Sequence, residues 1–343
     1  MRFSHAVAAV LSALTLAACG SDDDASTTAG GAGTTAGTTA SADAPGPFPV
    51  TITHTFGTTT VKAAPERVAT AGFNEQDFAL ALGVKPVAVR EFIGDFPFKT
   101  RPWAPGADSD PTPQYIGSTD IDIEKLAAAR PDVILGIYSF IDKGMYGKLS
   151  GIAPTIAQTK DFGEGAVPWD RQLLDTGKAL GRETRAKEVV ADVDRQFDDA
   201  KKAHPEFAGR KLTVAFESGG TLFNLGDDDL RQQFFTDLGF VTPKVNGKDY
   251  QEDNISRERL DVLDQDVLVL ISDDEKGILD DPLYQRLKAV KEGRVINVKA
   301  TDAFAGALGY NSPLSRPYLL KQVVPQLVAA VDGDPATKVP PAQ

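Results

Sequence analysis

The sequence has one cysteine and only three histidines among its 343 residues. A single cysteine excludes an internal disulfide framework. Zinc and manganese sites need several histidines together with acidic residues. His5 falls within the first ten residues, and we expect His54 and His204 to lie at the surface. The sequence therefore predicts neither a directly bound metal ion nor a resident cofactor.

Positive charge is also scarce. Lys and Arg total 36 against 48 Asp and Glu, which gives a formal net charge of −12. An acidic surface argues against nucleic-acid binding and against a basic face that binds membranes. An anionic ligand would have to be met by a local cluster of Arg or Lys.

Common catalytic motifs are missing as well. The sequence contains no G-x-S-x-G nucleophile elbow, no S-x-x-K, no paired histidines and no Walker loop. Beyond the N-terminus, no run of about 18 apolar residues predicts a transmembrane helix. We therefore expect no enzymatic activity.

What is present begins with an export signal. Arg2 precedes the apolar stretch Ala6–Ala18, which is too short to span a bilayer as a permanent helix. The stretch continues into Ala17-Ala18-Cys19-Gly20, which resembles a bacterial lipobox. We predict a signal peptide over residues 1–18 and a lipidated Cys19 that anchors the exported protein to the outer face of the cytoplasmic membrane. An ordinary secretory signal with a chance cysteine is the alternative.

Low-complexity segments are predicted at both ends of the mature chain. Residues 19–49 are mostly Gly, Ala, Ser, Thr and Asp, so burial cannot offset their chain entropy. We predict a disordered tether with an end-to-end distance of roughly 30 Å. Residues 333–343 are predicted to form a disordered tail.

Strand and helix patterns alternate after the tether. Residues 67–72 and 85–90 are typical of short strands around a helix at 75–82, and residues 133–137 of a buried strand. This spacing predicts an α/β fold with parallel sheets and right-handed crossovers. Residues 94–113 are rich in Pro, Gly and aromatics, and we expect a long functional surface loop there.

The pattern then repeats within the chain. Residues 76–83 recur at 232–239, and residues 122–133 recur at 256–267. Each recurrence alone is weak, but both keep their order and their strand–helix context. Together they predict two similar Rossmann-like lobes.

Two helices are predicted between the lobes. Residues 168–204 join a lobe over 50–167 to a lobe over 205–332, with helices at 170–180 and 183–203. The second helix would span about 30 Å. It predicts a stiff connector, or alternatively a helix packed on one lobe alone.

Three segments resemble the helical-hinge substrate-binding proteins of bacterial ABC importers. Within this family, they resemble the branch that binds iron siderophores. They are His54–Val68, Ile121–Ile134 and Asn311–Ser315. The resemblance covers about residues 51–331. It implies the two-lobed class III periplasmic binding protein fold, a monomer, and delivery of a ferric siderophore to a permease dimer with ATPase subunits. Haem or a corrinoid is the alternative ligand, and a surface lipoprotein without a transport role is the alternative function.

The resemblance also implies two docking residues. One surface glutamate per lobe contacts the permease in this family, and the matching residues are Glu124 and Glu258. Both are predicted in the first turn of a helix, where an acid also suits the helix dipole. Docking and dipole roles both remain open for them.

Ligands of open parallel sheets bind beyond the carboxyl ends of the strands. Aromatic rings there would cover the organic shell of an iron chelate, and guanidinium groups would neutralise anionic oxygens. The siderophore class is not specified by the sequence. The predicted ligand-binding residues are Phe73, Asn74, Arg90, Phe92, Trp103, Tyr138, Ser139, Glu217, Phe223, Phe304, Tyr310, Asn311 and Arg316.

Overall fold

The computed structural model describes residues 45–91, 96–104, 107, 110–219, 221–245, 248–249, 255–272 and 277–341. The predicted signal peptide, Cys19, most of the tether and Phe92 lie outside the described residues. These described residues form one compact unit. No helix in the described part of the chain is both long and apolar enough to cross a membrane.

The first lobe is built on a five-stranded parallel sheet in the order β5-β4-β3-β6-β7. β3 and β6 are buried along their whole length, as expected for parallel strands covered on both faces. An antiparallel hairpin, β1 (Val50–His54) and β2 (Gly57–Val61), precedes the sheet. The sheet strands are β3 (Val68–Thr70), β4 (Ala88–Val89), β5 (Gln114–Tyr115), β6 (Val133–Gly136) and β7 (Thr155–Ala157).

Short helices follow these strands: α1 (Glu75–Ala81), α2 (Ile123–Ala128) and α3 (Lys143–Ser150). Asp122 caps α2 and Asp142 caps α3, each by accepting a backbone N–H three residues further on. Such caps satisfy donors that the first turn of a helix leaves unpaired.

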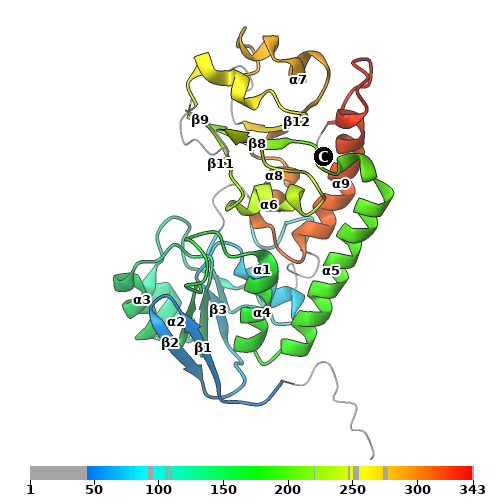
Figure 1. Ribbon diagram of the computed structural model, residues 1–343. Coiled ribbons are helices and arrows are strands. Elements are labelled where there is room, and N and C mark those ends of the chain that lie inside the picture. Colours follow the sequence, from blue (N-terminus) through cyan, green and yellow to red (C-terminus); the bar gives the residue numbers. More distant parts are fainter. Residues whose placement is uncertain are drawn as a thin grey trace, which may run out of the picture. The chain divides into compact units, whose positions relative to one another are not determined.

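Two helices join the lobes, α4 (Trp169–Ala179) and α5 (Glu183–Ala203). α4 packs against α1 and β1 of the first lobe, whereas α5 packs against α9 (Ser315–Val331) of the second. Figure 1 shows α5, in green, extending from α4 to the second lobe. The connector therefore contacts both lobes, and α5 has the bounds that the apolar spacing predicts.

The second lobe has a four-stranded sheet in the order β13-β12-β8-β9. β13, β12 and β8 are parallel, but β9 is antiparallel to β8. The parallel sheet is as predicted, and β9 adds an antiparallel edge strand, because a short connection between consecutive strands permits only an antiparallel hairpin. The strands are β8 (Leu212–Ser218), β9 (Thr221–Asn224), β12 (Val267–Ser272) and β13 (Val295–Lys299), and the pair β10 (Lys244–Val245) and β11 (Lys248–Asp249) lies apart from the sheet.

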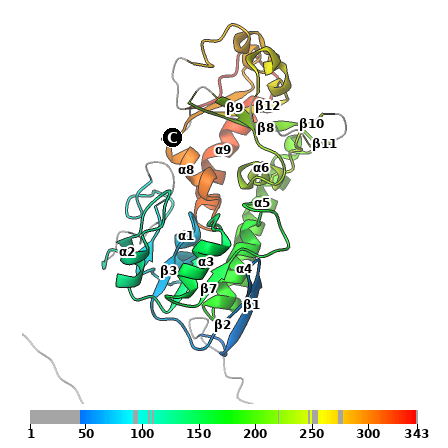
Figure 2. The same cartoon turned by 90° about the vertical axis from the view of Figure 1, so that its left-hand side faces the viewer.

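The helices of the second lobe are mostly short. The α-helices other than α9 are α6 (Leu230–Thr236), α7 (Lys288–Lys291) and α8 (Ala303–Tyr310). The 3₁₀ helices are η1 (Pro205–Phe207), η2 (Arg257–Leu263) and η3 (Tyr284–Arg286). In both views α8 lies between β8 and α1 (Figures 1 and 2).

The sequence repeats occupy equivalent places. Phe78 in α1 and Phe234 in α6 are both fully buried. α2 and η2 both begin after a polar cap, Asp122 or Ser256, but η2 is a 3₁₀ helix with a kink at Arg259. The repeats thus correspond in position, and less closely in helix type.

Both segments that were predicted to be disordered are ordered in part. The Gln326 side chain donates to the Pro340 carbonyl at 3.1 Å, and Val339 packs against the main core. At the other end, the Gly46 N–H donates to the Gly181 carbonyl at 2.7 Å. Residues 45–49 and 333–341 therefore belong to the folded unit, because their backbone groups and apolar side chains contact it.

Candidate ligand-binding site

Three neighbouring strands of the first lobe end at the same edge of its sheet. Phe73 follows β3, Arg90 follows β4 and Tyr138 follows β6. The Phe73 N–H donates to the Tyr138 carbonyl at 3.0 Å, and the Arg90 guanidinium lies 3.9 Å from the centroid of the Phe73 ring. The structure therefore brings these predicted ligand residues together where open α/β sheets bind ligands.

Phe140 extends this edge and was missed by the sequence prediction. Its ring centroid lies 6.0 Å from that of Phe73 and 5.0 Å from that of Tyr138. Nearly half of its surface, 48%, is exposed. Its φ of 54° is a left-handed conformation that costs about 1–2 kcal/mol for a residue with a Cβ. An exposed ring on a strained backbone favours a role in ligand contact.

Ser139 lies between Tyr138 and Phe140 but is buried. Its hydroxyl donates to the Gly136 carbonyl at 2.7 Å, and its own carbonyl accepts from Arg90 at 3.0 Å. Its contacts hold the loop after β6 in place, whereas the rings on either side supply the surface.

A buried glutamate supports the same loop. Glu75, at the start of α1, is 1% exposed, and its carboxylate accepts the backbone N–H of Tyr138. A Cβ on Gly72 would lie only 1.9 Å from this carboxylate, so a larger residue at position 72 would displace the Glu75 side chain. Burial raises the pKa of Glu75 to about 7, although the N–H of Tyr138 and the charge of Arg90 oppose the shift.

We expect Glu75→Gln to be more stable than the wild type at pH 8 but not at pH 4. The folded-state pKa of Glu75 exceeds its ordinary value of 4.5, so its contribution to stability is complete below pH 4.5 and is lost as pH rises through about 7. The difference should reach about 3 kcal/mol. Denaturant unfolding at both pH values measures it, with exposed Glu66→Gln as control. An equal effect of Glu75→Gln at both pH values would contradict the prediction.

The second lobe contributes a matching aromatic surface. Phe216 in β8 and Phe223 in β9 lie across the strand pair, with ring centroids 5.2 Å apart. The Arg231 guanidinium, from α6, lies 5.7 Å from the Phe216 ring centroid. Phe223 was predicted from the sequence, whereas Phe216 and Arg231 were not.

Tyr138 is where the two surfaces meet. Burial raises the pKa of its hydroxyl to about 12, and the charges of Asp229 and Arg231 in the second lobe also act on it. Asp229 and Arg231 form an ion pair at 2.8 Å. Arg231, which lies beside the Phe216 ring, therefore links the aromatic surface of the second lobe to Tyr138. We call Phe73, Tyr138, Phe140, Phe216 and Phe223 the aromatic site.

Four predicted ligand residues instead belong to a buried interlobe network. The Trp103 indole N–H donates to Asp77 at 3.0 Å. The Asn74 side chain donates to the Tyr310 carbonyl at 3.0 Å. Asn311 ends α8 in a left-handed conformation and donates to the Leu230 carbonyl. Because Asn74, Trp103, Tyr310 and Asn311 are all at most 2% exposed, the structure corrects their prediction as surface ligand contacts.

Phe304 and Glu217 also depart from the predicted surface. Phe304 is fully buried in the core. Glu217 is 2% exposed and accepts the Ser272 hydroxyl at 2.7 Å. Neighbouring residues of a strand point to opposite faces, so Glu217 faces away from Phe216 and toward Arg257, which lies 3.6 Å from it.

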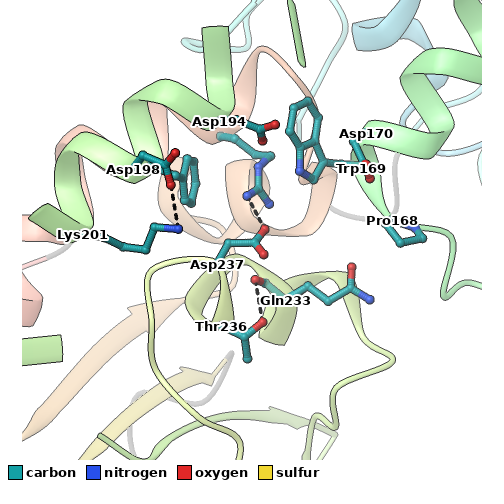
Figure 3. Close-up of a pocket in the computed structure, with 11 residues that line it drawn as sticks. Pro168, Trp169, Asp170, Asp194, Asp198, Lys201, Gln233, Thr236 and Asp237 are labelled. Carbon is teal, nitrogen blue, oxygen red and sulfur yellow. Dashed lines mark hydrogen bonds and ion pairs between the residues drawn. The ribbon is translucent and has the colours of Figure 1, made fainter. Parts of the chain in front are cut away.

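Arg316 is 1% exposed and its charge is used within the protein. It donates to Asn311 at 2.7 Å and to Asp237 at 2.6 Å. It borders a pocket of about 580 Å³ between α4, α5 and α6, where Asp194, Asp198 and Asp237 are seen with Lys201 (Figure 3). The mostly charged and polar lining makes this pocket a poor site for the organic shell of an iron chelate, whether the chelate is anionic or neutral.

The elements described above define a two-lobed binding protein whose lobes are linked by helices. A family model described as "Periplasmic binding protein" matches residues 79–301. The chain therefore belongs to the periplasmic binding protein family, with the class III architecture. Members of this family bind substrates for transport, and the protein is not an enzyme.

Named relatives and solved structures agree with this assignment. The ferric-anguibactin-binding protein FatB of Vibrio anguillarum is 27% identical over 74% of this chain and 80% of the relative. A periplasmic solute binding protein from Mycobacterium smegmatis is 33% identical, covers 82% of this chain and 99% of its own, and has a TM-score of 0.73. Streptococcus pneumoniae PiaA in complex with ferrichrome is 27% identical over 83% of this chain and 99% of its own, with a TM-score of 0.70.

Proposed function

We propose that this protein captures a ferric siderophore at the aromatic site and delivers it to an ABC importer. The observation that carries the proposal is the pair of aromatic surfaces, one in each lobe, that are linked through Arg231: it lies beside Phe216, and its charge acts on Tyr138. Rings from two sides can enclose the organic shell of a chelate, and lobe movement can release it. The similarity to FatB and to PiaA with ferrichrome supports an iron chelate as the ligand.

Titration of the purified protein with ferric siderophores tests this proposal. Ferric chelates should quench the intrinsic fluorescence at micromolar concentrations or below, and Phe140→Ala should weaken binding roughly tenfold because it removes an aromatic face. Leu283→Ala, which truncates another exposed apolar side chain, should leave affinity unchanged. Preferential binding of haem or a corrinoid would favour the alternative ligands. Binding of none of them would end the transport assignment.

We propose that Cys19 anchors the protein to the membrane by its lipid. The apolar stretch and Ala17-Ala18-Cys19 support this proposal, and one relative of this chain is named a probable siderophore-binding lipoprotein, YfiY of Bacillus subtilis. Cys19→Ser should move the protein from the membrane fraction to the soluble exported fraction, which fractionation and immunoblotting measure. Retention of the variant in the membrane fraction would refute the lipid anchor.

We further propose that Glu124 and Glu258 contact a permease. Each is exposed and is the second residue after a helix cap, Asp122 or Ser256. Lys125 pairs with Asp122 at 3.3 Å and Arg257 with Asp281 at 3.0 Å, so these neighbouring cations are directed elsewhere. Two equivalent acids, one per lobe, suit a permease with two related subunits.

A further inference from the structure

In the part of the chain that the structure describes, Arg90 and Arg231 are the guanidinium groups that flank the aromatic site, and their existing partners limit what the site can bind. Arg90 donates four hydrogen bonds to backbone carbonyls. Its partners are Ser118 at 2.6 Å, Ser139 at 3.0 Å, Ala71 at 3.4 Å and Thr119. A guanidinium has five N–H donors and no acceptor. At most one donor of Arg90 therefore remains for a ligand.

The face of the Arg90 guanidinium is covered as well. It lies 3.9 Å from the centroid of the Phe73 ring. The carboxyl groups of Glu75 and Asp120 act on its charge. Arg90 therefore serves to fix the loops after β3 and β6, and an anion could not form a two-pronged ion pair with it.

Arg231 carries a charge that is already compensated. Its Nε and Nη2 donate to the two carboxylate oxygens of Asp229 at 2.9 and 2.8 Å. The pair is about three-quarters buried, with side-chain exposures of 27% and 25%. The remaining N–H groups can donate to a neutral oxygen, but the ion pair as a whole has no net charge to offer a ligand.

The charge of the ferric complex then decides between ligand classes. Three hydroxamates carry three negative charges and exactly balance Fe³⁺, whereas three catecholates carry six and leave a trianion. Enclosing a trianion among aromatic rings requires uncompensated cations, because a buried charge without a partner is strongly unfavourable. A neutral complex needs only apolar surface and a few hydrogen-bond donors.

We propose that the aromatic site selects ferric trihydroxamates, which carry no net charge, over trianionic ferric triscatecholates. This selectivity rests on the proposed function, since it concerns the same site. It identifies Asp229 as a specificity-determining residue, because its carboxylate is what neutralises Arg231.

Two probes of opposite class test the selectivity: ferrichrome, a trihydroxamate, and ferric enterobactin, a triscatecholate. Fluorescence titration of the full folded protein should give at least about 100-fold tighter binding of ferrichrome, since the trianion finds no uncompensated guanidinium among the described residues of the site. Equal or tighter binding of ferric enterobactin would overturn the selectivity and leave siderophore transport standing. Failure to bind either siderophore, haem or a corrinoid would overturn both.

Asp229→Asn provides the second test. Asparagine can still cap α6 as the aspartate does, but it no longer neutralises Arg231. The ratio of ferric enterobactin affinity to ferrichrome affinity should rise at least about tenfold. Asp228→Asn removes the same charge from an exposed neighbour and should not change that ratio. An unchanged ratio in a folded Asp229→Asn variant, with folding checked by thermal melting, would overturn the role of Asp229.

Discussion

Replacing Asp77 by asparagine should lower the free energy of unfolding by about 3–5 kcal/mol and Tm by roughly 10 °C. The Asp77 carboxylate accepts from Arg101 at 2.6 Å, Trp103 at 3.0 Å and Ser312 at 2.7 Å. The Asp77 and Arg101 side chains are both fully buried. An amide would present hydrogens to groups that themselves donate, and it would leave the Arg101 charge unpaired.

This network joins segments that are distant in sequence. Asp77 lies in α1, Arg101 and Trp103 in the loop before β5, and Ser312 in the turn between α8 and α9. Because α8 and α9 pack on the sheet of the second lobe, the Asp77 carboxylate fastens that lobe to the first. Its loss should loosen the lobes as well as destabilise the fold.

A double variant separates the charge effect from simple loss of packing. Buried ion pairs can often be replaced by apolar residues at little cost, whereas removing one partner leaves the other as an unpaired buried charge. Asp77→Leu combined with Arg101→Met should therefore be more stable than Arg101→Met with Asp77 retained. Denaturant unfolding gives the four free energies of the cycle. If the double variant were as unstable as the sum of the two single variants, the charges would not be coupled.

The sequence predicts the helical connector well because the signal is local. The apolar residues Ala186, Val193 and Phe197 recur at helical spacing, and all three are buried in α5. The strands after which Phe73, Arg90 and Tyr138 lie are also found, since short apolar runs between helices are typical of buried parallel strands. The antiparallel β9 was not predicted, because its direction depends on a turn rather than on its own composition.

The long loop before β5 shows where local reasoning fails. Arg101 is charged and lies in a Pro-rich stretch, which is typical of a surface loop, yet it is 4% exposed. Its burial depends on Asp77, which is 24 positions away, and on Tyr310, which is 209 positions away. The same distant contacts turn Trp103 from a predicted ligand residue into part of the interlobe network.

The binding site was predicted on one side more fully than on the other. Phe140 lies one residue beyond the predicted Ser139. Extending the predicted site by one residue along the loop after β6 would have included it. Arg231 lies 156 positions after Glu75, which is the offset of the internal repeat. The repeat therefore marked Glu75 and Arg231 as equivalent positions, but neither was predicted as a site residue. That Arg231 is neutralised by Asp229 depends on side-chain geometry, and no spacing in the sequence shows it.

Replacing Glu124 and Glu258 together by alanine should reduce siderophore uptake by cells roughly tenfold or more, while ligand affinity stays unchanged. A few residues carry most of the binding energy of an interface, so losing one in each lobe should weaken docking strongly. Loss of an acid that faces a basic partner should also slow association. Neither residue belongs to the aromatic site or to the Arg90 and Arg231 groups beside it, so ligand capture should not depend on them.

The competing explanation is that these acids only stabilise helix ends. Glu183 is the matched control, because it is exposed and lies in the first turn of α5, outside the internal repeats. If the dipole role were the whole effect, Glu183→Ala would lower Tm about as much as Glu124→Ala and would impair uptake to the same degree. If docking is correct, the Tm changes are similar but uptake falls only when Glu124 and Glu258 are replaced. Normal uptake by the double variant, at equal protein levels in the membrane, would exclude docking through these two residues.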